Sequence, residues 1–277
     1  MGHLGDLVPR LLRFARRVLG RFFGANKGLL LAGGVGYNAL LSIIPLVAVV
    51  LSALSLVVDE DRLLRLVQSE LRLVIPGQTE TLMASVQSAL ASRQLFGGAS
   101  LVALLFFSSL ALRMLEDAMF LIFQHGEARR RSFLLSAVLP YLFIAGLALS
   151  LLALSGLAQI VDATALAWAS FAGIALTLSA IYVVLPTASV GWRRALVGGF
   201  VAAVLWEGAR RSLLWYFANL SLVNVVYGSF ATVIIVLLGM ELAAGIVLLG
   251  AQVIAELEAS ERAGVPWHVD PRATPEG

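Results

Sequence analysis

Long apolar runs that contain ionisable residues are the feature of this sequence that most constrains its fold. Residues 195–254 contain two such runs, separated by a short uncharged loop. Each run has the roughly 20 apolar residues that a helix needs to cross a bilayer. The first run carries Glu207, Arg210 and Arg211, and the second carries Glu241. Each charge at that depth costs about 2.5 to 3.5 kcal/mol, so the fold has to place these side chains against partners or water.

The composition extends this argument to the whole chain. Of its residues, 60% are hydrophobic and 13% are charged, whereas soluble domains are about half apolar and a quarter charged. Such a chain cannot cover its surface with polar groups in water. The sequence therefore predicts an all-α fold, a polytopic membrane helix bundle.

The apolar runs predict six transmembrane helices, at about residues 29–58, 99–123, 133–157, 163–185, 195–218 and 229–254. Lys and Arg residues gather in the N-terminal segment, in the loops after the second and fourth runs, and in the tail. The positive-inside rule then places both termini in the cytoplasm. The domain organisation expected is a basic amphipathic segment at 1–28, a transmembrane domain at 29–258, and a polar, flexible cytoplasmic tail at 259–277.

Two segments outside the apolar runs show amphipathic spacing. In residues 4–27, leucines and phenylalanines recur at helical spacing with arginines between them. This pattern is typical of a helix on an anionic membrane face, and equally of a plain basic flank that sets topology. Residues 59–98 form a polar interruption, read as two short amphipathic helices on the periplasmic side that rest on the bilayer or cover the bundle.

The first expected span contains a candidate helix kink at Ser42 and Pro45. Proline removes a backbone hydrogen bond, and a nearby serine hydroxyl can satisfy a carbonyl. Glycines earlier in the span allow close helix approach. Two interpretations stay open: a tightly packed kinked span, or a broken helix that lines a cavity.

The intramembrane charges form the candidate site. Spacings of three and four residues allow pairing within the second and fifth spans. Because one glutamate cannot neutralise two arginines, we expect the second, fifth and sixth spans to meet around one buried polar pathway. The alternative is that the charges are structural pairs or reach an interface. The residues concerned are Arg113, Glu116, Asp117, Glu207, Arg210, Arg211 and Glu241.

Four stretches of the chain carry a shared pattern: GVGYNALLSIIPLVAVVLSAL, SLALRMLEDAMFLIF, the segment from LPTASVGWRR to VYGSFATVIIVLL, and VLLGAQV. Together they resemble the YihY/BrkB family of bacterial inner-membrane proteins. The family usually has Trp and Tyr where this chain has Gly239 and Glu241, and Glu where it has Gln252. The positions that carry the family pattern are Tyr37, Pro186, Trp206, Tyr216, Tyr227, Gly228, Gly250 and Gln252.

The resemblance implies a multi-pass protein of the bacterial inner membrane. One function consistent with the charges is a transporter or flippase-like protein for a lipid or another amphiphilic or anionic envelope substrate. The alternative is a non-transporting scaffold or regulator of envelope assembly. Expected partners are membrane lipids, such a substrate, and a second copy or an envelope protein, with no nucleic acid.

An enzyme is not expected, although the family once carried a ribonuclease label. Hydrolytic nucleases use clustered carboxylates with metal ions, or acid–base histidines. Here the cytoplasmic loops are short and basic, and His3, His125 and His268 are scattered. The chain has no cysteine, which excludes thiolate metal sites, and no metal or cofactor motif occurs.

Overall fold

The computed structural model describes residues 2–54, 93–123, 162–185, 190–219 and 231–271, with isolated positions 64, 65, 68, 83, 84 and 87. Within these residues it contains only helices and the turns that join them. The all-α class predicted from the sequence is thereby confirmed. The expected third span and most of the segment at 59–98 lie outside the described residues.

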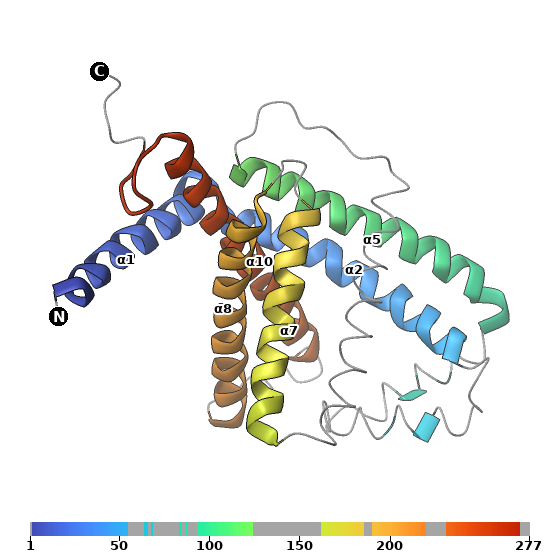
Figure 1. Ribbon diagram of the computed structural model, residues 1–277. Coiled ribbons are helices and arrows are strands. Elements are labelled where there is room, and N and C mark those ends of the chain that lie inside the picture. The colour runs from blue at the N-terminus through green and yellow to red at the C-terminus, as the bar shows by residue number, and fades with distance from the viewer. Residues whose placement is uncertain are drawn as a thin grey trace.

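Helices occupy the other five expected spans (Figure 1). They are α2 (Gly28–Leu54), α5 (Arg93–Phe123), α7 (Ala163–Val184), α8 (Trp192–Asn219) and α10 (Ala231–Arg262). Before them come α1 (Gly2–Gly20) and a π-helical turn, η1 (Arg21–Ala25). In the described residues, two stretches are long and apolar enough to cross a membrane, Thr164–Val184 and Val236–Arg262. The number of spans and the side of each terminus stay predictions.

Two helices extend beyond the apolar runs that predicted them. Helix α5 begins at Arg93 rather than near residue 99, and α10 continues to Arg262 rather than ending near 254. The last turns of α10 remain helical because their polar side chains have partners. Glu256 pairs with Arg17, and Glu258 pairs with Arg194.

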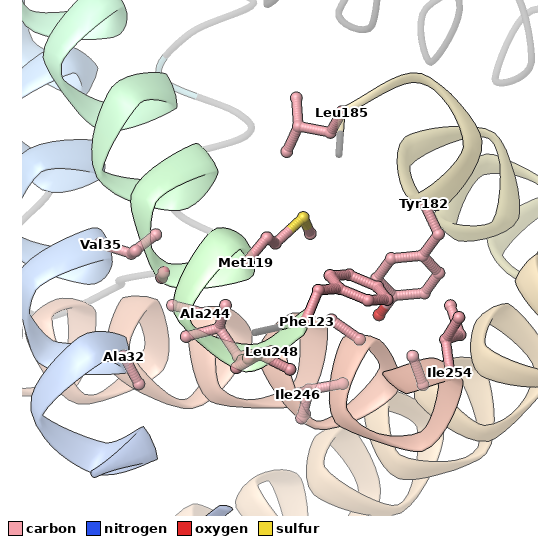
Figure 2. Packing of buried hydrophobic residues seen from close by; sticks show 14 of the residues in the cluster. Ala32, Val35, Met119, Phe123, Tyr182, Leu185, Ala244, Ile246, Leu248 and Ile254 are labelled. Carbon is pink, nitrogen blue, oxygen red and sulfur yellow. The ribbon is translucent and has the colours of Figure 1, made fainter. Parts of the chain in front are cut away.

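Helix α10 is the centre of the bundle. Helices α2 and α5 lie side by side, α7 and α8 form a second pair, and α10 contacts members of both pairs. Figure 2 shows buried side chains of α2, α5 and α7 gathered over α10, including Val35, Met119 and Tyr182. The Tyr182 hydroxyl donates a hydrogen bond of 2.7 Å to the carbonyl of Val247, which ties α7 to α10.

Glycines allow the close helix contacts around α10. A Cβ atom on Gly36 would lie 2.9 Å from the backbone nitrogen of Glu241, so α2 touches the backbone of α10. A Cβ atom on Gly250 would lie 3.0 Å from the carbonyl of Gly198 on α8 and would overlap the Tyr182 hydroxyl. Small residues serve this purpose in membrane bundles generally, because close packing holds the helices together there.

Candidate functional site

A charged triad on α8 is the first polar grouping. Glu207 accepts hydrogen bonds from Arg210 Nε (3.0 Å) and Nη2 (2.8 Å) and from Arg211 Nε (2.6 Å). The side chains are 27%, 50% and 75% exposed, respectively. Glu207 lies fifteen residues after Trp192, or roughly 22 Å along the helix axis at 1.5 Å per residue. One carboxylate thus serves two guanidinium groups near the middle of α8.

The other expected pathway residues lie elsewhere. Glu241 points toward α2, where its Oε1 would be 3.8 Å from a Cβ atom on Gly33. Among the described residues it forms no ion pair with the α8 arginines. Arg113, Glu116 and Asp117 lie on α5, which packs against α2 and α10. The structure therefore brings Glu207, Arg210 and Arg211 together but does not link them to Glu241 by an ion pair.

The kink and family positions fall in varied surroundings. The Ser42 hydroxyl donates to the carbonyl of Ala39 at 2.6 Å, and α2 runs through Pro45 to Leu54 as one helix. The kink itself stays a prediction.

Of the family positions, Gly250 and Gln252 are buried, Tyr37 and Trp206 are exposed, and Tyr216 lies within α8. The other three, Pro186, Tyr227 and Gly228, lie outside the described residues.

A buried ion-pair network joins the N-terminal segment to the end of α10. The Glu256 carboxylate, 3% exposed, lies 3.0 Å from Arg17 Nε and 3.1 Å from Arg21 Nη1. Arg21 Nη2 reaches Asp270 at 3.0 Å. We call this set the terminal network; it consists of Arg17, Arg21, Asn26, Gln252, Glu256, Ser260 and Asp270.

Amide groups extend the terminal network into the bundle. Asn26 Nδ2 donates to Gln252 Oε1 at 2.6 Å, and Gln252 Nε2 donates to Glu256 Oε1 at 3.1 Å. Gln252 therefore connects the turn before α2 to the ion pairs. The family position that departs from Glu in this chain is occupied by an amide that both donates and accepts, and the buried acid stands one turn later at Glu256.

The sequence predicts a flexible tail from residue 259. In the structure α10 continues to Arg262, and Trp267 and Val269 of the tail contact α1. Arg17 donates to the carbonyl of Trp267 at 2.8 Å and to that of Val269. The Trp267 ring meets the Phe14 ring edge-on, with centroids 5.7 Å apart. Buried guanidinium groups need acceptors, and the carbonyls of the tail supply them.

His268 lies in this docked tail among arginines. Its Nδ1 is buried and has no hydrogen-bond partner in the described part of the chain. Burial lowers the pKa of the imidazole, and the nearby charges of Arg10, Arg13 and Arg17 lower it further. The docked tail therefore favours neutral His268.

The terminal network was not predicted from the sequence, because its members lie in two segments at opposite ends of the chain, at 17–26 and 252–270. A signal was present: Arg17 and Arg21 are four residues apart, and so are Gln252, Glu256 and Ser260. Residues four apart share one helix face. Within the described ranges, no group of three or more His, Asp or Glu side chains is arranged to hold a metal ion.

The described residues form a helical bundle in which two stretches are apolar and long enough to cross a membrane, and an amphipathic helix lies at one end; this is the architecture of an integral membrane protein. The chain belongs to the Virulence factor BrkB family, whose model matches residues 20–272. The resemblance to the YihY/BrkB family is thus confirmed. This is a family of membrane proteins and not a known family of enzymes.

Relatives in several bacteria carry the name UPF0761 membrane protein. The one from Azotobacter vinelandii is 32% identical over 276 residues, covering 94% of this chain and 66% of its own length. The one from Paraburkholderia xenovorans is 41% identical over 97 residues, covering 33% of this chain and 22% of its own length. The one from Methylibium petroleiphilum is 38% identical over 85 residues, covering 31% of this chain and 20% of its own length. The chain thus spans less than two thirds of these relatives. No solved structure matches it.

Proposed function

We propose that the protein is a multi-pass protein of the bacterial inner membrane, with both termini cytoplasmic, that moves a lipid or another anionic amphiphile across the membrane. The observation that carries this proposal is the charged triad on α8. One carboxylate between two arginines leaves one positive charge in surplus near the middle of α8, which is one of the expected spans.

The triad is more exposed than the buried pathway expected from the sequence, so its arginines are open to the surroundings of α8. Both arginine side chains are at least half exposed, so they face away from the helices that pack on α8. Ionisable groups within membrane spans face water-filled cavities or partners and mark substrate routes. A guanidinium group matches phosphate with two parallel hydrogen bonds. The surplus arginine therefore suits an anionic headgroup in transit.

A scaffold is the second candidate, and one observation favours it. The terminal network anchors α1, which extends away from the other helices (Figure 1) with exposed leucines along its apolar side. Such a surface suits an envelope partner. A scaffold would need the docked α1 but not the charges of Arg210 and Arg211.

Reconstitution of the purified chain in liposomes tests the proposal. The measurement is the rate at which a fluorescent phosphatidylglycerol analogue changes leaflet. We expect the wild type to exceed protein-free vesicles, and Arg210→Gln or Arg211→Gln to slow the exchange roughly 10- to 100-fold, as loss of hydrogen bonds to a charged group implies. The control is Arg193→Gln, an exposed arginine in the first turn of α8 whose guanidinium lies over Trp192.

Glu207→Gln gives a further check, because it leaves two arginines without their carboxylate. We expect it to lower both the stability and the exchange rate. An exchange rate for wild type equal to that of empty vesicles would reject transport and leave the scaffold. Variants at Arg210 and Arg211 that match wild type would reject the role of the triad.

A further inference from the structure

Helix α1 separates two grooves of different chemistry. A basic groove of about 570 Å³ lies between one face of α1, with Arg13, Arg16 and Arg17, the first residue of η1, Arg21, and residues 268–270 of the tail. An apolar groove of about 550 Å³ lies under the opposite face, between α1, α8 and α10, and Trp267 forms part of its wall. Only apolar and aromatic side chains line this second groove.

The basic groove holds more positive charge than the protein neutralises. Arg17 and Arg21 are paired with Glu256 and Asp270. Arg13 and Arg16 are exposed, and in the described residues neither has a carboxylate within ion-pair distance. The orphaned Nδ1 of His268 adds an unsatisfied polar atom to the wall. The groove is therefore complementary to an anion.

The two grooves meet along the edge of α1 that faces away from the tail. Arg16 lines the basic groove, and Leu19, three residues later, lines the apolar one. Leu12 is four residues before Arg16. Residues at these spacings are surface neighbours with Cβ atoms about 5–6 Å apart. Leu12 and Leu19 are 65% and 45% exposed, so this edge offers an apolar path from the cationic side to the apolar groove.

We propose that this edge of α1 binds an acidic phospholipid of the surrounding leaflet. Its phosphate pairs with Arg13 and Arg16, and one acyl chain passes over Leu12 and Leu19 into the apolar groove beside Trp267. A water-soluble phosphate would satisfy the arginines but leave the apolar groove empty, and an uncharged lipid would leave the arginines unmatched. The site is separate from the α8 triad, and it holds whether or not the protein transports.

Trp267 gives a direct reporter of this lipid. The other four tryptophans, Trp168, Trp192, Trp206 and Trp215, are exposed, so we expect the chain with these four changed to Phe to keep its packing. This chain is reconstituted in phosphatidylcholine vesicles that contain a minor fraction of lipid with brominated acyl chains, either phosphatidylglycerol or phosphatidylcholine. Bromine quenches tryptophan at contact, so the loss of emission measures occupancy of the apolar groove.

We expect brominated phosphatidylglycerol to occupy the site more strongly than brominated phosphatidylcholine. An arginine near an anionic headgroup contributes roughly a fivefold preference, so two arginines give a preference of roughly 25-fold. Arg13→Gln combined with Arg16→Gln should abolish this preference without altering Trp267 emission in unbrominated vesicles. Ala15→Phe, which adds a ring to the apolar groove, should reduce quenching by both lipids.

The matched control is Arg193→Gln, which removes an exposed arginine that lines neither groove, and the preference should survive it. Excess inorganic phosphate should not displace the brominated lipid. Equal quenching by the two lipids in the unmutated grooves, or a preference that persists in the double variant, overturns the proposal. Displacement by phosphate would also overturn it, because the site would then bind a soluble anion.

Discussion

Glu256→Gln is the most informative single change at the terminal network. The substitution keeps the size of the side chain and removes its charge. Two guanidinium groups, only 8% and 14% exposed, then lose their shared carboxylate. Arg17 keeps Ser260 and two tail carbonyls, and Arg21 keeps Asp270.

The magnitude follows from burial and from the contacts that remain. Removal of one partner of a buried ion pair costs about 3 to 5 kcal/mol. The remaining acceptors around Arg17 and Arg21 place this case at the lower end, at about 3 kcal/mol. Because each 1.4 kcal/mol is a factor of ten, the population in which α1 and the tail are undocked should rise on the order of 100-fold.

Limited proteolysis measures that population in the purified chain. Trypsin cleaves after arginine, and the bonds after Arg17 and Arg21 become accessible only when α1 leaves α10. When opening is fast relative to cleavage, the cleavage rate follows the open population. Mass spectrometry of the fragments gives the rate at each bond, so cleavage at the exposed arginines of α1 can be separated from cleavage at these two.

Glu258→Gln is the matched control. Glu258 is on the same helix and is also buried, but its partners Arg194 and Arg262 are 28% and 55% exposed. Loss of pairs this exposed costs at most about 1 kcal/mol, or roughly a fivefold increase in cleavage. If the two variants accelerate cleavage after Arg17 equally, or if neither does, Glu256 does not hold α1 in place.

Two further predictions follow from α10 and the tail. Gly250→Ala should destabilise the bundle by about 1 to 3 kcal/mol, because its methyl group overlaps the Tyr182 hydroxyl. The control Gly208→Ala, which has open space around it, should be neutral or stabilising by up to about 1 kcal/mol. Equal stability of the two variants in thermal unfolding would refute the close packing at Gly250. Docking of the tail should be insensitive to pH above about 6.5, the ordinary pKa of histidine, and should weaken as the pH falls below that value. The reason is that docking lowers the pKa of His268, so the undocked tail binds the proton at a higher pH than the docked tail does. Hydrogen exchange of residues 265–271 measures this, and His268→Asn should flatten the profile.

The helices were predictable where a single run of residues determines them. Residues 163–185 were expected as a span, and α7 occupies Ala163–Val184, since the apolar run and its polar ends specify the helix locally. The π-helical turn η1 was not expected. It depends on a hydrogen bond from the backbone of Asn26 to Arg21 and on a left-handed Lys27 with φ of +48°, which no apolar periodicity records.

The pairing of charged residues was likewise predictable only within a single helix. Spacing along one helix was enough to pair Glu207 with Arg210 and Arg211, because partners three and four residues apart share a face. The pair between Arg21 and Glu256 joins residues 235 positions apart. Such a pair depends on how helices are arranged in space, and the sequence alone offers many acids and arginines to combine.

Water accessibility of the triad tests the central claim most directly. The chain has no cysteine, so single thiols can be introduced without background. Val204 lies one turn before Glu207 on the same face and is exposed, and Leu176 is an equally apolar, exposed position near the middle of α7. A membrane-permeant maleimide confirms that both thiols can react. If the α8 charges line a water-accessible pathway, Val204→Cys in intact membranes should react with a charged, impermeant methanethiosulfonate and Leu176→Cys should not. Equally slow reaction at both positions would contradict such a pathway along α8.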